Sequence, residues 1–289
     1  MKTRTFCPGH ITGFFQIVEH PEPMRSGSRG AGMCIALGVQ CDAEVKKGDG
    51  KVQVFYDSTL ASAPVTERAL SVLAKPNKVD VTVNLHHQLP IGQGFGMSAA
   101  GALASAHALA ESVGLKFIDA VRAAHRAEVE NRTGLGDVAA LSRGGITFRR
   151  KEGVMPYGQI DKINAEPEVV LCVVGKPIST AEVLADRERK RRVNTVGKEC
   201  VARMAATPTL NSLMRLSREF MVKTQLASKE VEDAVLAAEK HGQASMVMLG
   251  SSVFAIGDAD ALEKELSQHG QVFRTKVDWR GPRVISQTP

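Results

Sequence analysis

The stretch LPIGQGFGMSAAGALASAHAL, residues 89–109, places three glycines, Gly92, Gly94 and Gly96, within five positions and then continues into an alanine-rich segment. Glycine permits positive φ and lets a ligand approach the main chain closely. The first turn of a helix adds unpaired N–H groups and a partial positive charge. A glycine-rich loop that leads into a helix near Ser98 is therefore suited to hold phosphate oxygens. Glycine spacing alone is equally consistent with a tightly packed strand-to-helix turn.

The segments on either side of this loop predict a mixture of strands and helices. Residues 79–90 alternate apolar and polar side chains, which is typical of a half-buried strand, and Pro90 ends that strand. A helix is expected from about 98 to 113. Further strands are predicted at 11–18, 33–45, 51–57 and 146–153, and further helices at 65–75 and 117–131.

The pattern changes between residues 159 and 167, where a second lobe is expected to begin. The predicted elements there are a buried strand at 169–174, helical segments between 180 and 241, two strands around a glycine turn at 245–258, a helix at 260–270 and a last strand at 271–278. The tail after residue 280 is expected to be loose. This organisation predicts an N-terminal domain over 1–160 and a C-terminal domain over 161–289.

Composition limits the possible functions of the 289-residue chain. The formal net charge is +6, but aromatic residues make up only 4%, which leaves few stacking surfaces for nucleic acid. Much of the positive charge lies in RERKRR, residues 187–192, which is either a solvated face or a lid that attracts anionic substrates. Five scattered cysteines argue against a zinc site or a disulfide framework. Without a signal-like N-terminus or a membrane-spanning segment, we expect a cytoplasmic protein with no nucleic-acid or membrane partner.

The glycine loop matches neither of the two common phosphate-binding motifs. It lacks GxxxxGK[ST], and it reads GxGxG rather than GxGxxG. The pattern Pro-x-Gly-x-Gly-x-Gly-x-Ser-Ala-Ala instead resembles the ATP-binding motif of the GHMP kinases, which include galactokinase, homoserine kinase and mevalonate kinase. The resemblance implies a two-lobed α+β fold, with an N-terminal α/β lobe that carries the phosphate loop and a ferredoxin-like α+β C-terminal lobe. It also implies ATP binding by Pro90, Gly92, Gly94, Gly96, Met97, Ser98 and Ala99.

Two carboxylates complete the resemblance. Phosphoryl transfer requires Mg²⁺ and a group that orients or deprotonates the attacking hydroxyl. In GHMP kinases a glutamate binds the metal, and an aspartate in a Gly-x-x-Asp context lies beside the substrate hydroxyl. Carried over to AHRAEVENRTGLGDVAA, Ser98 and Glu128 would hold Mg²⁺ and Asp137 would be the catalytic carboxylate. Glu130 is the alternative metal ligand.

The N-terminal motifs narrow the resemblance further. The stretches PGHITGFF, SGSRGAG and GLGDVAALSRGGITFRRKEG are similar to those of archaeal pantoate kinases, which phosphorylate the 4-hydroxyl of (R)-pantoate on the route to coenzyme A. This implies ATP and pantoate as substrates, a homodimer, and Arg149 as the clamp for the pantoate carboxylate. Further candidate substrate contacts are His10, Ser28, Arg29 and His125, although a histidine is often purely structural.

Three points remain open from the sequence. The first motif lacks the lysine that mevalonate kinases carry there, so Asp137 would act without it. The third GHMP motif should be ASMVMLGSSVFAIGD, but it retains only Gly250 and Gly257, and a plain hairpin turn is the alternative. The acceptor could also be homoserine, shikimate or mevalonate, and a non-catalytic nucleotide-binding protein is the other alternative.

Overall fold

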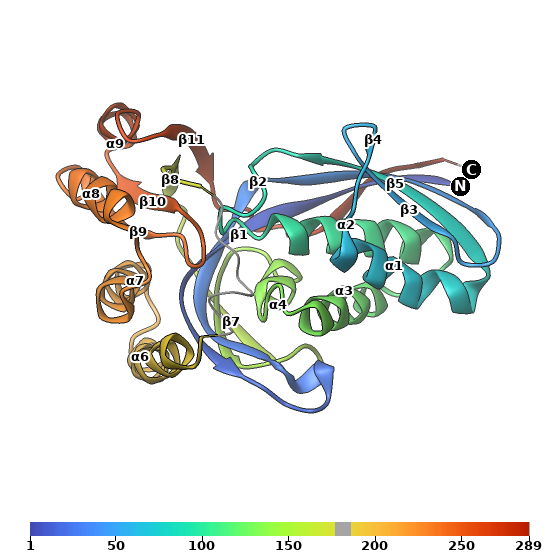
Figure 1. Ribbon diagram of the computed structural model, residues 1–289, viewed down its shortest axis with the longest axis horizontal. Helices are drawn as coiled ribbons and strands as arrows, with labels where there is room; N and C mark the ends of the chain where they lie inside the picture. Colours follow the sequence, from blue (N-terminus) through green and yellow to red (C-terminus); the bar gives the residue numbers. More distant parts are fainter. Residues whose placement is uncertain (177–185, 289) are drawn as a thin grey trace.

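Two β-sheets organise residues 1–176 and 186–288, which are the residues that the computed structural model describes. In Figure 1 the larger sheet and its helices occupy one end of the molecule, where both chain termini lie, and the smaller sheet occupies the other end. The long first strand runs from this end to the middle of the molecule, where it meets α6 and α7 of the other lobe. This two-lobed arrangement is the one expected from the sequence.

The larger sheet has eight strands within the described residues. Its order is β12-β1-β2-β5-β3-β4, and β6 pairs with both β2 and β7. The neighbouring strands are antiparallel except for the parallel pair β3 and β5. The strand bounds are β1 (Lys2–Val18), β2 (Gly27–Lys47), β3 (Val52–Tyr56), β4 (Thr59–Leu60), β5 (Val79–His87), β6 (Ile146–Lys151), β7 (Gln159–Ile163) and β12 (Arg283–Thr288).

Strands β1 and β2 are longer than the sequence pattern predicts. The expected strands begin at residues 11 and 33, whereas the observed ones begin at Lys2 and Gly27. The glycine-rich start of β2 does not resemble a strand because glycine has a low strand propensity. Here glycine is required by close approach: a Cβ on Gly32 would lie 2.1 Å from the carbonyl oxygen of Ile11. Pairing with β1 therefore outweighs local propensity.

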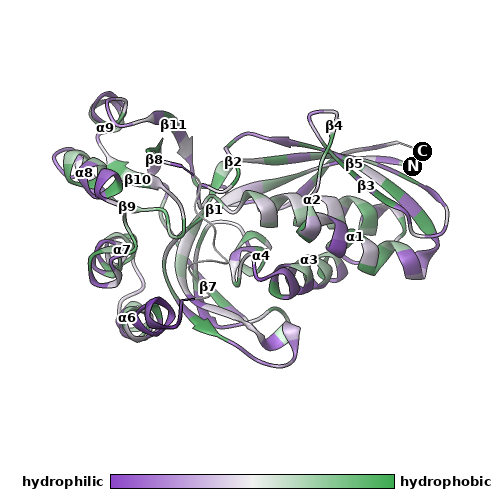
Figure 2. Cartoon of the chain, in the orientation of Figure 1, coloured by the Kyte–Doolittle hydropathy of each residue, from purple (hydrophilic) through white to green (hydrophobic). Residues whose placement is uncertain are grey.

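Three helices cover one face of the larger sheet: α1 (Pro64–Asn77), α2 (Met97–Ser112) and α3 (Phe117–Asn131). Helix α2 lies centrally, and its Ala100, Ala104 and Ala108 are fully buried. The small side chains allow α2 to contact the sheet, α1 and α3 at once. In Figure 2 α2 is mostly white and green, whereas α6 carries long purple stretches. The short helices η1 (Pro23–Arg25) and α4 (Asp137–Leu141) complete this lobe.

The second lobe has the expected ferredoxin-like sheet. The order β11-β8-β10-β9 is antiparallel throughout and corresponds to 4-1-3-2 when its strands are counted along the chain. The elements are β8 (Glu168–Val173), α6 (Arg187–Ala206), α7 (Leu210–Thr224), α8 (Lys229–Ala238), β9 (Gly242–Met246), β10 (Ser252–Gly257), α9 (Ala259–Leu266) and β11 (Gln271–Lys276). Among the described helices, none is long and apolar enough to cross a membrane.

The helical segments predicted between 180 and 241 are α6, α7 and α8, and the predicted part from 180 to 185 lies outside the described residues. The basic run 187–192 forms the first turns of α6. Asp186 caps this helix, since its carboxylate accepts hydrogen bonds from the backbone N–H groups of Glu188 and Arg189 at 2.9 and 3.1 Å. The run is thus part of a helix and not an independent loop.

The tail after residue 280 is a strand, which corrects the expectation of a loose segment. Strand β12 pairs with β1, so that Lys2 lies opposite Thr288. The Arg283 guanidinium lies 4.4 Å from the centre of the Phe6 ring and donates a 2.9 Å hydrogen bond to the Asp278 carboxylate. The expectation is wrong because the partner of this strand is at the opposite end of the chain. Strands β7 and β12 thus belong to the larger sheet, although β7 spans the predicted lobe boundary and β12 lies far beyond it.

Strand β1 also joins the two lobes. The backbone N–H of Ile17 donates to the side-chain oxygen of Asn194 on α6 at 2.8 Å. A Cβ on Gly197 would lie 2.1 Å from the carbonyl oxygen of Phe15, so α6 packs directly on the strand. The middle of β1 thus lies where the lobes meet, which is also where the site is found.

Candidate active site

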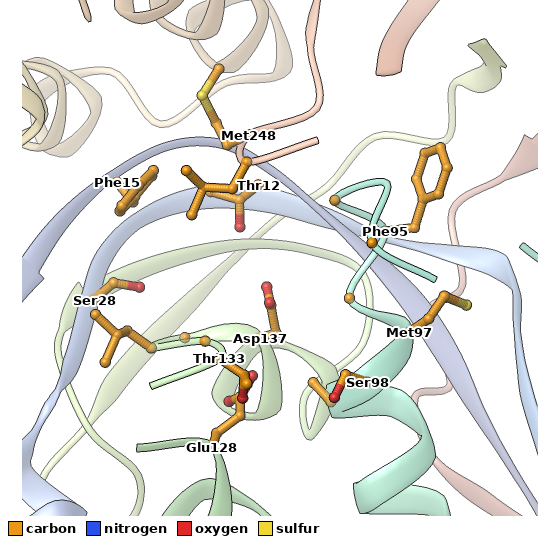
Figure 3. A pocket seen from close by; sticks show the side chains of 18 of the residues that line it. Thr12, Phe15, Ser28, Phe95, Met97, Ser98, Glu128, Thr133, Asp137 and Met248 are labelled. Atoms are coloured by element: carbon orange, nitrogen blue, oxygen red, sulfur yellow. The ribbon is translucent and has the colours of Figure 1, made fainter. Parts of the chain in front are cut away.

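A cavity of about 360 Å³ lies between the lobes. Six parts of the chain line it: the glycine loop with the start of α2, the middle of β1, Ser28 of β2, Glu128 of α3, residues 133–137 at the start of α4, and the turn at 248–249 between β9 and β10. In Figure 3 Asp137 extends into the space between Thr12 of β1 and Glu128 of α3, with Ser98 at the start of α2. The chain thus brings segments from distant parts of the sequence to one cavity.

The glycine loop has the backbone that its sequence predicts. Gly92, Gly94 and Gly96 have φ values of 80°, 82° and 66°, in the region that favours glycine. Gly96 is the N-cap of α2, and no described side chain caps this end of the helix. Ser98 is exposed and lines the cavity. The first-turn N–H groups of α2 are therefore free to bind an anion.

The loop is held in place by the turn between β9 and β10. A Cβ on Gly94 would lie 2.8 Å from Cγ1 of Val247, and a Cβ on Gly250 would lie 2.1 Å from the carbonyl oxygen of Gln93. The Gln93 amide donates a 2.9 Å hydrogen bond to the carbonyl of Gly175. The weakly matching third motif thus packs directly against the glycine loop, in spite of its missing glycines.

Glu128 and Asp137 both lie close to Gly134. A Cβ there would be 2.2 Å from Oε1 of Glu128 and 3.5 Å from Oδ2 of Asp137. Glu128 is 2% exposed, and its other oxygen accepts a 3.4 Å hydrogen bond from the backbone N–H of Val138. Burial raises the pKa of Glu128 well above its usual range, and the charge of Asp137 raises it further.

The alternative metal ligand, Glu130, is positioned differently. It accepts hydrogen bonds from Arg68 at 2.6 Å and from Arg126 at 2.7 Å on the surface of α3. Arg68 lowers the pKa of Glu130 most, which is typical of a paired surface acid. The geometry therefore favours Glu128.

Asp137 is paired with His10 on β1. The distance from Oδ1 of Asp137 to Nδ1 of His10 is 2.7 Å, and the hydroxyl of Thr12 lies 3.4 Å from the same nitrogen. His10 is fully buried, and burial lowers its pKa against the opposing effect of Asp137, so the ring is neutral and donates from Nδ1.

This pairing keeps Asp137 ionised. Burial by itself would raise the pKa of Asp137, but the hydrogen bond from His10 and the charge of Arg149 outweigh it, and the pKa is lowered. The side chain of Asp137 is 28% exposed, toward the cavity. The site therefore presents a carboxylate that is charged at neutral pH.

Arg149 lies directly behind the cavity wall. It is 1% exposed, and its Nε and one terminal nitrogen have no hydrogen-bond partner among the described residues. A Cβ on Gly136 would lie 2.9 Å from that Nε and 2.2 Å from the hydroxyl of Ser28. Burial lowers the pKa of Arg149. A guanidinium with unused donors thus stands one layer behind Ser28 and Gly136, both of which line the cavity.

Of the five candidate substrate contacts, Ser28 lines the cavity, and His10 and Arg149 are buried next to residues that line it. The other two make contacts elsewhere. Arg29 donates a 2.6 Å hydrogen bond to Glu152 and does not line the space. His125 is fully buried, with Nε2 3.0 Å from the carbonyl oxygen of Ser26 and 3.2 Å from that of Pro23. His125 thus fixes the segment before β2, which is a structural role of the kind that histidines often have.

Sequence reasoning does not single out several other residues of the site. Thr12, Phe15, Leu135 and Leu249 border the cavity, and Gln93 supports the loop from behind. Thr12 and Phe15 lie within the PGHITGFF motif, but alternation along a strand does not show which face meets a ligand. Leu135 and Leu249 lie in turns, where apolar residues form no recognisable pattern.

The donor set fits Mg²⁺ bound together with phosphate. Within the described residues, no three His, Cys, Asp or Glu side chains converge to hold a metal by themselves. Mg²⁺ in kinases usually takes one or two carboxylates and completes its shell with phosphate oxygens and water. The buried carboxylate of Glu128 lacks a cationic partner at hydrogen-bond distance among the described residues, which a cation would supply.

Comparisons with known proteins identify the family. The GHMP kinases N terminal domain matches residues 64–145. A pantoate kinase of Methanospirillum hungatei JF-1 is 35% identical, over 98% of this chain and 96% of its own length. A pantoate kinase of Thermococcus kodakarensis is 34% identical, over 91% of this chain and 90% of its own length.

Solved structures agree with this assignment. A phosphotransferase related to the CoA biosynthesis pathway superposes with a TM-score of 0.89 and 29% identity, over 98% of both chains. The homoserine kinase of Cytophaga hutchinsonii, at 16% identity and a TM-score of 0.73 over 98% of this chain and 97% of its own, shares the fold. The chain therefore belongs to the pantoate kinase family of the GHMP kinases.

Proposed function

We propose that this protein transfers the γ-phosphoryl group of ATP to the 4-hydroxyl of (R)-pantoate. The observation that carries the proposal is the Asp137 carboxylate, held by neutral His10 at 2.7 Å and facing a cavity that the glycine loop borders. A charged carboxylate beside a phosphate-binding loop is an arrangement suited to alcohol phosphorylation. The family relationship supports pantoate as the alcohol.

The nucleotide phosphates would lie against the glycine loop and the uncapped start of α2. The main chain of Gly92, Gly94 and Gly96 lines the cavity without side chains that would obstruct a phosphate. Metal binding would fall to Glu128 and the Ser98 hydroxyl, which lie on the same side of this space in Figure 3. When bound there with ATP, Mg²⁺ neutralises phosphate oxygens and the charge that develops on the transferred group.

Asp137 would position the 4-hydroxyl of the substrate. Its Oδ1 is occupied by His10, so Oδ2, the oxygen nearer to Gly134, is the one left for the substrate. Since the pKa of Asp137 is lowered, the group is a weak base, which suits an orienting role in a loose transition state that needs little early deprotonation. We expect Asp137→Ala to abolish turnover while ATP still binds.

The substrate carboxylate would lie at the corner formed by Ser28 and Gly136. The Arg149 guanidinium stands immediately behind this corner with unused donors, so it contributes positive charge and, after a small shift of Gly136, direct hydrogen bonds. We expect Arg149→Ala chiefly to raise the KM for pantoate, because a carboxylate remote from the reacting hydroxyl is bound equally in the ground and transition states.

A direct assay tests the proposal. Purified protein with ATP and Mg²⁺ is given pantoate, homoserine, shikimate or mevalonate, and ADP release is followed. The proposal predicts the highest kcat/KM for pantoate. Preference for another acceptor would assign a different GHMP activity, and ATP binding without turnover of any acceptor would indicate a non-catalytic protein. Light scattering during size-exclusion chromatography tests the expected homodimer.

A further inference from the structure

Leu249, at the tip of the turn between β9 and β10, has an unusual backbone conformation. Its φ is 62°, in the left-handed region that a branched apolar side chain rarely adopts. The other non-glycine residues with positive φ in the described part of the chain are all polar or charged: Asp57, Ser58, Lys78, Arg132 and Gln225. Glycine would avoid the strain at position 249, so the leucine side chain must serve a purpose there.

The position of Leu249 is fixed relative to the cavity. The turn is closed by the N–H of Gly250, which donates to the carbonyl of Val247 at 3.1 Å, and the N–H of Met248 donates to the carbonyl of Thr12 at 3.1 Å. Leu249 is only partly buried and lines the cavity. The strained residue is thus held between β1 and the open space.

Phe15 and Leu135 are among the other apolar side chains that line the same cavity. Phe15 is 5% exposed, and its far side packs on Phe220 of α7 with 5.6 Å between the ring centres. Leu135 lies two residues before Asp137 and is partly buried. Figure 3 shows Phe15 and Thr12 of β1 on the opposite side of the space from Glu128 and Ser98. Phe15, Leu135 and Leu249 thus give the cavity apolar lining beside the polar groups that would bind a hydroxyl and a carboxylate.

The proposed substrate has an apolar centre of matching character. Pantoate carries two methyl groups on C3, between the 4-hydroxyl and the carbon that leads to the carboxylate. If the hydroxyl lies at Asp137 and the carboxylate at Ser28, C3 lies between them. We propose that Phe15, Leu135 and Leu249 bind this dimethyl carbon and make the enzyme selective for pantoate over unbranched hydroxy acids. This inference rests on the proposed function.

The test compares pantoate with 2,4-dihydroxybutanoate, which has the same carboxylate and hydroxyl groups but no methyls. Contacts with small apolar groups are worth roughly 10- to 200-fold in kcat/KM, so the unaltered enzyme should prefer pantoate by at least about tenfold. In Leu249→Gly the ratio of kcat/KM for pantoate to kcat/KM for 2,4-dihydroxybutanoate should fall several-fold. The fall should come from a lower kcat/KM for pantoate, while kcat/KM for 2,4-dihydroxybutanoate stays nearly unchanged. Leu249→Asn, which tolerates positive φ but is polar, should behave alike, and Leu249→Met should retain the ratio.

Stability separates this role from a structural one. Because glycine relieves the strain at φ 62°, the Tm of Leu249→Gly should equal or exceed that of the unaltered protein while selectivity falls. Lys78→Gly is the matched control, since Lys78 has φ 51° at the exposed end of α1, away from the cavity, and should leave selectivity unchanged.

The possible failures are distinguishable. An enzyme that does not phosphorylate pantoate at all overturns the proposed function and this inference with it. An enzyme that phosphorylates pantoate but keeps its selectivity in both Leu249→Gly and Leu249→Asn overturns the inference alone. Equal turnover of the two acids by the unaltered enzyme does the same.

Discussion

At the scale of single residues, the pairing of His10 with Asp137 sets the charge of the proposed catalytic group. Without the Nδ1 donor, the largest influence that lowers the pKa of Asp137 against burial would be lost, and this pKa would rise. The ionised form is the active one, so activity is lost as pH falls through this pKa. The ordinary pKa of aspartate is about 3.9. Because the pKa of Asp137 is lowered, the unaltered enzyme should lose this activity only below that pH. We expect His10→Ala to move the acidic limb of the kcat/KM profile to higher pH.

His10→Asn is the matched variant, because its amide nitrogen takes approximately the place of Nδ1 and restores a donor. The pH profile of His10→Asn should return toward that of the unaltered enzyme, while His10→Ala keeps the shifted limb. If both variants lose turnover with no change in the profile, His10 contacts the substrate itself and does not act through Asp137.

Glu128 should reduce the stability of the metal-free protein. Its pKa is raised in the folded state, so folding favours the protonated form, and stability falls as pH rises above the unfolded value of about 4.3 toward the folded pKa. A tenfold change in the acid dissociation constant corresponds to about 1.4 kcal/mol of folding free energy. Glu128→Gln should therefore raise the Tm of the protein in EDTA at pH 7 by roughly 2 °C or more, with no gain near pH 4.

The same substitution should abolish turnover and weaken stabilisation by Mg²⁺ with ATP. Glu130→Gln, on the exposed surface of α3, serves as its control and should leave both properties nearly unchanged. A stable, fully active Glu128→Gln enzyme would show that the metal is held elsewhere.

The sequence indicated the residues of the site that belong to recognisable spacings and missed those that do not. Ser98, Glu128 and Asp137 lie within motifs, and folding brings them to one cavity. Phe15 and Leu249 also lie within motif stretches, but nothing there marks them as lining residues, because apolar residues are common and their exposure to a cavity depends on packing between distant elements. His125 lies in the motif region, but its hydrogen bonds to Ser26 and Pro23 could be known only from the fold.

At the scale of elements, the glycine loop works only as a unit with the turn between β9 and β10. Alanine at position 94 would place a Cβ at φ 82° and 2.8 Å from Val247. Strain and contact would both displace the loop, so Gly94→Ala should raise the KM for ATP by tenfold or more, on the order of 1.4 kcal/mol, with a smaller effect on the KM for pantoate.

Gly114→Ala controls for backbone strain alone. Gly114 has φ 73°, but a Cβ there meets nothing within 4 Å, and the residue follows α2 at the end remote from the loop. The KM of the Gly114→Ala enzyme for ATP should stay unchanged even if the Tm of this variant falls. Equal kinetic effects in both variants would mean that general destabilisation, not loop geometry, limits ATP binding.

Elements with a strong internal pattern were predictable, whereas those that depend on a distant partner were not. The alternation of β5 and the periodicity of α1 and α3 are local properties, and the structure has these elements at about the expected positions. The start of β2 is rich in glycine and β12 is short and exposed, so neither resembles a strand by itself. Each becomes a strand through pairing with β1.

At the scale of the whole molecule, β1 makes the two lobes one structure. It pairs with β12 at one end of the larger sheet, carries His10 and Thr12 into the site, and packs against α6 and α7 of the second lobe. A change at the edge of β1 should therefore alter both the activity of the site and the stability of both lobes. If β1 couples the lobes in this way, the two lobes should unfold together and not as independent units divided near residue 160.

Deletion of residues 283–289 tests this connection. The variant loses the pairing of β12 with β1, the contact of Arg283 with Phe6 and its bond to Asp278, together worth about 1–3 kcal/mol. We expect one cooperative transition in calorimetry with a Tm lower by roughly 5 °C, and loss of activity on heating at that same temperature. Val222→Ala, on the exposed surface of α7, should change neither. Two separate transitions, of which only one moves, would instead mean that the lobes fold independently and that β1 does not couple them.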